Sequence, residues 1–394
     1  MSDPLVSVLM VNYNHEKTIK RTIESVLNQT YKNIQFIIVD DGSKDGSIEV
    51  IKSFKDPRIE LFELHDNNHI CLATNFGFKK VKGDYLARID SDDIWYPEKL
   101  KKQLQFINNN KDCNICFTWS DWIDEDGNLI NDSMSDLMDL TDVTYSTQQE
   151  WLNTFYYIGN CLLHSSVLMK RCIMEETGDF TIGYRQLHDF DYWIRIAKKH
   201  NLYVIPERLI AMCRFRESNV NASSITEKND IRTFNEFMDI RENFFNNIDD
   251  KVLIDSFSHD FINKNSVSKK ELECEKAFLL CHPQVSWPNH IPLAGIKKLK
   301  NLLEEEQYRI LLQEKFDFTI HDFYEMMTHH LYEDERLVDE RQKYILENNN
   351  LYLEKKELEG KLSNVLSSSS WKITAPIRFI VAHLRKSKNC HRYD

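Results

Sequence analysis

The chain has 394 residues, a formal net charge of −12 and 42% hydrophobic residues. This length accommodates about two to three domains with a sizeable core, and the composition is that of a globular rather than a disordered protein. The acidic balance argues against nonspecific binding to nucleic acid. Nine scattered cysteines, the lack of a secretory signal at the start and the lack of a long apolar run predict a cytoplasmic protein with reduced thiols.

The first hundred residues alternate apolar strands with short helices. The pattern predicts strands at residues 5–14, 34–43, 58–64 and 84–90, with helices at 17–30, 47–54 and 71–81. Strands of continuous apolar character that are separated by helices imply a mostly parallel sheet covered on both faces. We therefore expect an α/β fold of Rossmann-like type in this part of the chain.

Polar residues follow three of the predicted strands. In parallel sheets of this kind, ligands bind at the carboxyl ends of the strands. Polar groups from separate parts of the sequence therefore gather at one edge, which predicts a ligand site there. These groups are Asn12-Tyr13-Asn14, Asp40-Asp41-Gly42-Ser43 and Asp90-Ser91-Asp92-Asp93.

Asp90 and Asp92 form an Asp-x-Asp pair behind a buried strand. Alternation along the chain sends both side chains to the same side, where two carboxylates repel unless a cation lies between them. Mg²⁺ and Mn²⁺ prefer oxygen ligands, and Mg²⁺ keeps one or two carboxylates while substrate phosphates complete its shell. The pair therefore predicts a metal-bridged diphosphate. Asp93 points the other way and is expected to cap a helix that begins at Pro97.

Residues 113–216 have a mixed pattern. Residues 114–130 resemble two strands around an Asp-Gly turn, which gives a second pair, Asp124 and Asp126, a structural interpretation. A further strand is expected within 161–171 and a helix at 188–200. The loops GxxxxGK[ST] and GxGxxG are absent, which disfavours a kinase, a P-loop hydrolase and a dinucleotide-dependent oxidoreductase.

Three stretches resemble the inverting family 2 glycosyltransferases, which have the nucleotide-sugar-binding GT-A fold. They are residues 7–47, 83–100 and 187–197, in the order typical of the family, and together they span about residues 5 to 220. The resemblance implies that Tyr13 stacks on a pyrimidine base and that Asp41 accepts a hydrogen bond from the base. It also implies that Asp92 binds the metal directly and that Asp90 lies near both ribose and metal.

The resemblance assigns the general base to Asp189, which would deprotonate the acceptor hydroxyl. A helix N-cap is the structural alternative for this residue. Two positions depart from the family pattern, because His188 replaces a usual Glu and Thr74 stands where many members have Arg. One phosphate contact is thus missing. Asn12 and Ser91 complete the expected nucleotide-sugar site, and either Arg214 or Arg216 could supply the phosphate contact or have a plain surface role.

The expected organisation is a GT-A domain at 1–225, a helical domain at 226–330, a long helix at 331–366 and a basic amphipathic tail at 367–394. Apolar residues recur every seven positions in the long helix, but Arg341, Asn348 and Lys355 interrupt the seam. Packing on its own domain and a homo-oligomeric coiled coil both stay open. Basic and bulky apolar residues in 371–394 suggest binding to an anionic membrane surface, and docking on the acidic body is the alternative.

These patterns together predict a glycosyltransferase that needs Mn²⁺ or Mg²⁺. It would move a sugar from a UDP- or dTDP-sugar to a carbohydrate or lipid-linked acceptor in bacterial surface polysaccharide or glycoconjugate synthesis, at the inner face of the membrane. A sugar-phosphate nucleotidyltransferase is a rival of similar fold, although no glycine-rich basic loop follows the first strand. A noncatalytic scaffold that keeps the fold is the rival from another class.

Overall fold

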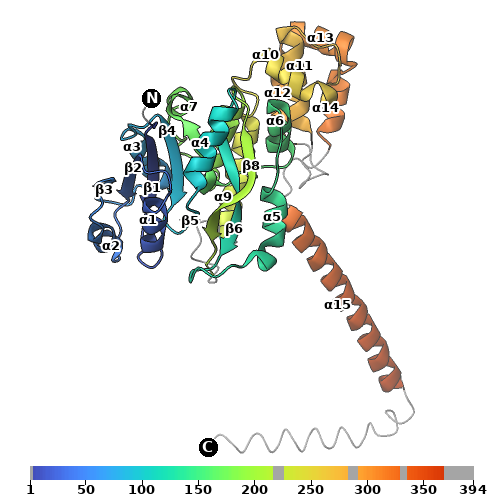
Figure 1. The fold of residues 1–394 in the computed structure, drawn as a ribbon. Coiled ribbons are helices and arrows are strands. Elements are labelled where there is room, and N and C mark those ends of the chain that lie inside the picture. The colour runs from blue at the N-terminus through green and yellow to red at the C-terminus, as the bar shows by residue number, and fades with distance from the viewer. Residues whose placement is uncertain (1–2, 216–225, 283–291, 329–334, 368–394) are drawn as a thin grey trace, which may run out of the picture. The chain divides into compact units, whose positions relative to one another are not determined.

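The computed structural model describes residues 3–215, 226–282, 292–328 and 335–367. The chain divides into two compact units, residues 1–329 and residues 330–394. Within the described ranges, the first unit holds a mixed sheet and helices α1 to α14, and the second holds helix α15 (Figure 1).

The described part of the first unit contains an eight-stranded sheet in the order β3-β2-β1-β4-β7-β6-β8-β5. Its parallel half consists of β1 (Val6–Asn12), β2 (Ile34–Asp40), β3 (Ile59–Glu63) and β4 (Tyr85–Asp90). The other half consists of β5 (Ile94–Trp95), β6 (Ile115–Ile123), β7 (Leu168–Lys170) and β8 (Tyr203–Cys213). Here β7 runs antiparallel to β4 and β6, whereas β6 and β8 are parallel. The expected α/β class is confirmed.

Both faces of the parallel half are buried under helices. Val6, Val8 and Met10 of β1 share one apolar layer with α1 (Ile19–Leu27), α2 (Ser47–Ser53) and α4 (Lys99–Asn109). Leu9 and Val11 share the opposite layer with α3 (His69–Phe78) and α8 (His188–Ala197). Successive strand residues point to opposite faces, so a strand buried on both sides must be apolar throughout.

The middle of the chain differs from the expected pattern. Residues 114–130 form one strand rather than two, because the chain makes only a single bridge from Ile123 to Leu129 before it enters a 3-10 turn, η1 (Asn131–Met134). A second 3-10 turn, η2 (His164–Ser166), precedes the short β7. Strand β8 was not expected. It contains Pro206 and its register against β6 shifts near Trp119, so that its apolar alternation is broken.

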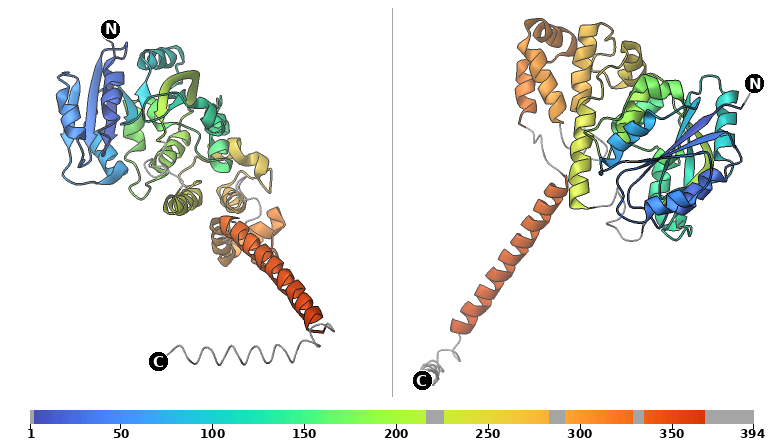
Figure 2. Two further views of the ribbon diagram at one scale, coloured as in Figure 1. Left: turned by 90° about the horizontal axis from the view of Figure 1, so that it is seen from below. Right: turned by 90° about the vertical axis from the view of Figure 1, so that its left-hand side faces the viewer.

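The described chain is helical from residue 226 onward, as the sequence predicts. Helix α9 spans Glu227–Glu242, and five shorter helices follow within the first unit, forming a group beside the sheet in the right view of Figure 2. Earlier in the chain lie α5 (Ser135–Thr141), α6 (Gln148–Tyr157) and α7 (Arg171–Thr177). The five later helices are α10 (Asp250–Phe257), α11 (Lys269–Cys281), α12 (Leu293–Glu304), α13 (Glu306–Phe316) and α14 (Ile320–Met326).

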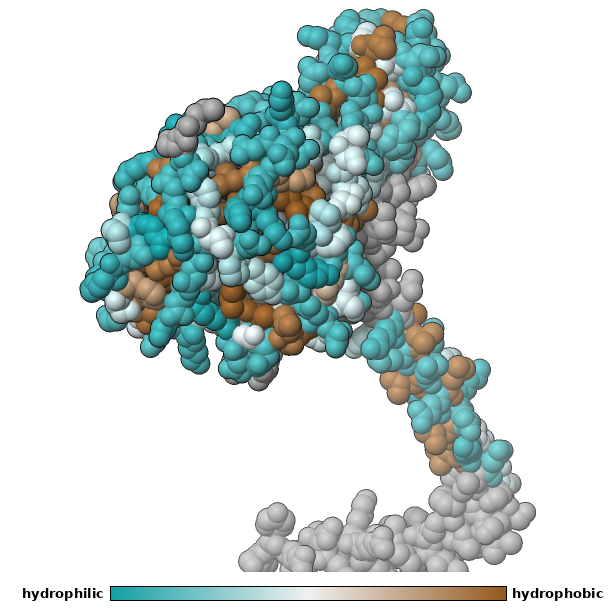
Figure 3. Space-filling view, in the orientation of Figure 1, coloured by the Kyte–Doolittle hydropathy of each residue, from teal (hydrophilic) through white to brown (hydrophobic). Residues whose placement is uncertain are grey.

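Helix α15 (Glu335–Ser367) is 33 residues long and confirms the long helix that the heptad pattern predicts. Large apolar side chains are exposed along it, among them Tyr344, Leu351 and Leu358. Figure 3 shows hydrophobic surface in separate patches along this helix. No helix in the described ranges is long and apolar enough to cross a membrane. The basic tail at 371–394 lies outside the described residues.

Candidate active site

The loops that follow β1 and β2 are joined by a buried polar network. Asn12 Nδ2 donates to Asp40 Oδ2 at 2.7 Å and to Ser43 Oγ at 3.1 Å. Asp40 Oδ1 also accepts from the backbone N–H of Ser43 at 2.9 Å. The Oδ1 atom of Asn12 is buried and has no hydrogen-bond partner among the described residues. Asn12 therefore holds the two strand ends together and keeps one acceptor unused. Tyr13, the next residue, is 39% exposed at the same edge.

Asp41 is 2% exposed and holds the loop that precedes α3. Its Oδ1 atom accepts from the backbone N–H of Asn68 at 2.8 Å and from Asn68 Nδ2 at 3.3 Å. Burial raises the pKa of Asp41, and the hydrogen bonds from Asn68 oppose this shift. The next residue, Gly42, has φ of 75°, and a Cβ there would lie 2.8 Å from the carbonyl carbon of Asp66. Only glycine allows the two loops to approach this closely.

The three aspartates after β4 have different surroundings. The side chain of Asp90 is 34% exposed, and its Oδ1 accepts from Arg88 Nη2 at 3.1 Å. Asp92 is partly buried. Burial raises the pKa of Asp92; His15 and Arg21 act against this shift, and the Asp90 carboxylate adds to it. A carboxylate whose charge is unfavourable in the folded state, with a second carboxylate beside it, is suited to a bound cation.

Asp93 does not cap a helix, contrary to the expectation. Its Oδ1 accepts from the backbone N–H of Cys213 at 2.9 Å, and its Oδ2 accepts from the hydroxyl of Ser165. Helix α4 begins at Lys99, and the residue before it, Glu98, makes no capping hydrogen bond with its side chain. Asp93 instead joins the end of β4 to η2 and to the end of β8. Burial raises its pKa well above the usual range, and Asp92 adds to this effect.

Hydrogen bonds from α1 and from the residue before it hold the loop at residues 91–93 in place. The carbonyl oxygen of Ser91 accepts from the hydroxyls of Thr18 at 3.3 Å and Thr22 at 3.1 Å. Arg21 donates to the carbonyl oxygens of Asp92 at 3.3 Å and Glu125 at 2.7 Å. Ser91 is buried, and the hydrogen bonds to its carbonyl oxygen position its neighbours Asp90 and Asp92.

Asp189 lies in the first turn of α8 and is partly buried. Its Oδ2 accepts from Asn160 Nδ2 at 3.1 Å, and its Oδ1 accepts from the backbone N–H of Phe190 at 2.8 Å. Leu187 occupies the N-cap position, so the alternative role of Asp189 as N-cap is wrong. Burial raises the pKa of Asp189; His188 opposes this shift, whereas the charge of Asp90 adds to it. Asp90 and Asp189 are therefore close enough to interact electrostatically.

Arg88 belongs to the site and was missed by the sequence reasoning. It is 2% exposed on β4, and its Nε and Nη1 have no hydrogen-bond partner in the described part of the chain. Burial lowers its pKa, and the carboxylates of Asp90 and Asp189 oppose that shift. A charged residue within the apolar run of a buried strand, "YLARID", was the signal that could have revealed it.

Two histidines, His164 and His188, and the arginine Arg214 lie near these carboxylates. His164 is 8% exposed and packs against Phe180, so it is a core residue, and burial lowers its pKa well below the usual range. Its ring centroid lies 5.5 Å from that of His188. The backbone N–H of Arg214 donates to the carbonyl oxygen of Ile123 at 2.7 Å. Burial lowers the pKa of Arg214, and the charge of Asp92 opposes this shift. Arg216 lies outside the described residues.

The second Asp-x-Asp pair has the structural role that the sequence suggested. Asp124 Oδ1 accepts from the backbone N–H groups of Asp126 at 3.0 Å and Asn128 at 2.9 Å, which closes the turn after β6. In the described ranges, no group of three or more His, Cys, Asp and Glu is placed to hold a metal. The two carboxylates of Asp90 and Asp92 would suit a hard cation whose shell is completed by phosphate oxygens and water.

Known proteins match both the sequence and the fold. The family described as Glycosyl transferase family 2 matches residues 7–171. An uncharacterized glycosyltransferase of Methanocaldococcus jannaschii is 32% identical over 215 residues, which cover 53% of this chain and 71% of that protein. The Escherichia coli protein WfaP is 30% identical over 197 residues, covering 50% of this chain and 71% of that protein, and its name describes a UDP-Glc:α-D-GlcNAc-diphosphoundecaprenol β-1,3-glucosyltransferase.

The solved structure of S. aureus TarS 1–349 in complex with UDP-GlcNAc superposes with a TM-score of 0.51 at 17% sequence identity. The superposition covers 76% of this chain and 86% of the TarS chain. This likeness is one of fold, and it places the sheet and its helices in the GT-A class. The sequence matches go further, and on them the chain belongs to glycosyltransferase family 2 and is a transferase enzyme.

Proposed function

We propose that this enzyme is an inverting glycosyltransferase that uses Mn²⁺ or Mg²⁺ and transfers a sugar from a UDP- or dTDP-sugar. The observation that carries the proposal is the placement of three carboxylates. Asp90 ends β4 and Asp92 follows it, and Asp189, from a distant helix, lies near enough for its pKa to respond to the charge of Asp90. Asp90 and Asp92 can hold a cation and Asp189 can act as a base, and metal-assisted sugar transfer uses both functions.

The base in this proposal is the carboxylate of Asp189. It takes the proton from the acceptor hydroxyl while that oxygen forms a bond to the anomeric carbon, and the bond to the diphosphate oxygen breaks on the opposite face. Configuration at the anomeric carbon is inverted as a result. Asn160 orients the base, since its amide donates to Asp189 Oδ2 at 3.1 Å. A cation held by Asp90 and Asp92 would neutralise the charge that develops on the diphosphate.

The nucleotide in this proposal occupies the edge formed by the loops after β1 and β2. Tyr13 stacks on the base, since its ring is exposed there. Asp41 accepts a hydrogen bond from the base. The nucleotide-sugar site also includes Asn12, Ser91, Arg214 and Arg216, of which the arginines contact phosphate.

The names of two similar proteins support a choice of first substrates. WfaP acts on UDP-Glc and a diphosphoundecaprenol-linked GlcNAc, and TarS has been solved with UDP-GlcNAc. We accordingly propose a uridine donor, with dTDP-sugars as the alternative, and a lipid-linked or carbohydrate acceptor in surface polysaccharide or glycoconjugate synthesis. The first panel would contain UDP-glucose, UDP-GlcNAc and dTDP-glucose, with a GlcNAc-diphosphate polyprenol as acceptor.

The test combines donor binding with turnover. Calorimetry should show that one of these donors binds with Mn²⁺ and binds more weakly in chelator, and that Asp92→Asn removes the difference. Asp126→Asn changes an aspartate of the turn pair and should leave donor binding unchanged. Donor binding that is equal in Mn²⁺ and in chelator would contradict the proposed role of the cation.

Turnover separates the proposed enzyme from its rivals. Asp189→Asn should retain donor binding and lose UDP release by roughly 10² to 10⁴-fold, the range typical of a removed general base. A noncatalytic scaffold would bind the donor and release no UDP in either form. A nucleotidyltransferase would release pyrophosphate from UTP and a sugar phosphate, which the wild-type protein should fail to do.

We also propose a peripheral location at the inner face of the membrane, where a lipid-linked acceptor is found. The basic and apolar residues of 371–394 support it. Vesicles of phosphatidylglycerol and phosphatidylethanolamine should carry the full chain in a flotation assay and should leave a chain that ends at residue 370 behind. Equal flotation of both would contradict the proposal.

A further inference from the structure

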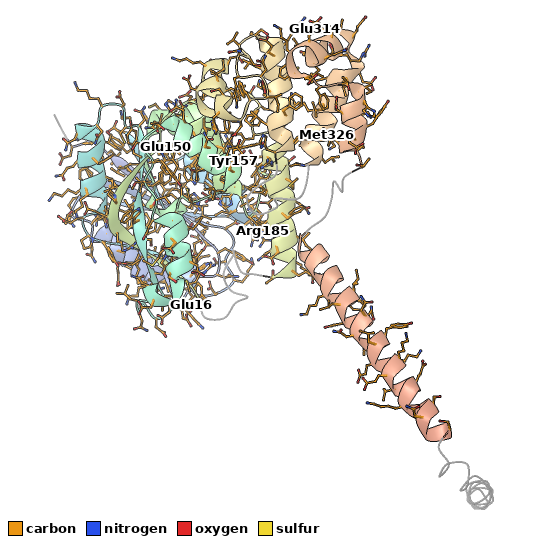
Figure 4. The ribbon with its side chains drawn as sticks, turned by 90° about the vertical axis from the view of Figure 1, so that its right-hand side faces the viewer. Glu16, Glu150, Tyr157, Arg185, Glu314 and Met326 are labelled. Carbon is orange, nitrogen blue, oxygen red and sulfur yellow. The ribbon has the colours of Figure 1, made fainter. Side chains whose placement is uncertain are left out.

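A single buried carboxylate on α9 holds the chain segment that leads into α8. Glu236 is 7% exposed. Its Oε1 accepts from the backbone N–H of Arg185, and its Oε2 accepts from those of Gln186 and Leu187, each at 2.8 Å. Figure 4 shows Arg185 beside α9. Three successive N–H groups from one helix entrance thus converge on one side chain of another helix.

These N–H groups belong to Leu187, the N-cap residue of α8, and to the two residues before it. The first N–H groups of a helix cannot bond within it, and a side chain at the N-cap usually accepts from one of them. The N-cap residue of α8 is Leu187, and its side chain makes no such bond. Glu236 instead fixes the chain that enters the helix and places a negative charge at the positive end of the helix.

Two further contacts connect α9 to the same region. Tyr184 Oη donates to Asp239 Oδ2 at 2.5 Å. The ring of Phe190 stacks on that of Phe237, with centroids 6.1 Å apart and planes 7° apart. Residues on one side of α9 therefore hold the chain immediately before and immediately after Asp189.

We propose that Glu236 is a positioning residue for sugar transfer, which rests on the proposed role of Asp189 as the base. By fixing residues 185–187, Glu236 sets the direction in which the Asp189 carboxylate meets the acceptor hydroxyl. It touches neither substrate nor the reacting atoms. The match to the family covers residues 7–171, so both α8 and α9 lie beyond it.

The chain offers a matched control in a second buried carboxylate. Glu275 on α11 is fully buried and accepts from the backbone N–H groups of Ile262 and Asn263, each at 2.9 Å, and from the hydroxyl of Ser266 at 2.8 Å. Glu275 thus accepts three hydrogen bonds, as Glu236 does, although one of its donors is a side-chain hydroxyl. The segment it holds contains none of the proposed site residues, so a change there reports on stability alone.

The experiment compares Glu236→Gln with Glu275→Gln in the full chain. Both should lower the melting temperature, because each amide replaces one acceptor oxygen by a donor. Only Glu236→Gln should accelerate amide hydrogen exchange in a peptide covering residues 184–190. It should also lower kcat for UDP release from UDP-GlcNAc or UDP-glucose, by about tenfold or more, since small displacements of a reacting group are costly. The KM for the donor should change less than twofold.

A double variant shows whether Glu236 acts through the base. In an Asp189→Asn background, Glu236→Gln should cause no further loss of UDP release. A further loss there, or an equal fall of kcat in Glu275→Gln, would overturn the inference, as would unchanged kcat together with faster exchange. If Glu236→Gln does not fold, Tyr184→Phe removes the bond to Asp239 and should change exchange and kcat in the same direction. Full turnover in Asp189→Asn alone would instead refute the proposed function.

Discussion

Removal of the Asp90 carboxylate should cost stability as well as cation binding, because Arg88 depends on it. Arg88 is 2% exposed, its Nη2 donates to Asp90 at 3.1 Å, and its Nε and Nη1 have no partner among the described residues. Breaking a buried ion pair by removing one partner costs about 3–5 kcal/mol. Since the Asp90 side chain is 34% exposed, water replaces part of the interaction. We expect Asp90→Ala to lower the free energy of unfolding by about 2–3 kcal/mol.

The assay is thermal unfolding in chelator and without donor, so that loss of ligand binding does not contribute. The melting temperature of Asp90→Ala should fall by roughly 3–4 °C, because the unfolding entropy grows with the size of the unit. Asp92→Ala is the matched control, because burial raises the pKa of Asp92. A carboxyl group whose pKa is higher in the folded than in the unfolded state is destabilising when it is ionised at neutral pH. Asp92→Ala should therefore melt at the wild-type temperature or above.

A second change tests the physical reason. Arg88→Met removes the buried charge and keeps much of the side-chain volume, so the pair Arg88→Met and Asp90→Ala should recover most of the lost stability. If Asp90→Ala had the wild-type melting temperature, the stability of the fold would not depend on the pairing of Arg88 with Asp90. If the double variant had a lower melting temperature than Asp90→Ala, the loss of stability would not come from the uncompensated guanidinium of Arg88.

Three further predictions concern the base, the nucleotide edge and the long helix. Burial raises the pKa of Asp189, so kcat/KM should fall as the pH drops through a value above the ordinary carboxyl pKa of about 4, and a pH–rate profile without this acidic limb would contradict the assignment. Gly42→Ala should lower the free energy of unfolding by roughly 1–3 kcal/mol and weaken donor binding, because φ is 75° and the new Cβ would meet Asp66 at 2.8 Å. A variant with the wild-type melting temperature and donor affinity would contradict this prediction. If α15 forms an intermolecular coiled coil, Leu351→Glu with Leu358→Glu should convert a dimer to a monomer in sedimentation, whereas identical sedimentation would favour packing within one chain.

The amino-acid sequence by itself determined the parallel half of the sheet. Strands β1, β2 and β4 are buried on both faces, so each is a nearly unbroken apolar run that can be recognised without knowledge of its neighbours. Asp90 and Asp92 could be recognised because they stand at the end of such a strand. The helix that carries Asp189 could be recognised from its own apolar pattern. Local periodicity also predicted the helical character of the chain after residue 226 and the long α15.

Only the tertiary structure decided what lies between these elements. Strand β8 escaped prediction because a bulge and a proline break its alternation, and those irregularities are tolerated through its pairing with β6. Asp93 was expected to cap a helix, yet it bonds to Ser165 and Cys213, which are distant in sequence. Glu236 could not be foreseen either, since its partners are backbone N–H groups, which every residue except proline carries. Spacing in a sequence encodes which face a side chain occupies, whereas long-range partners depend on how the elements pack.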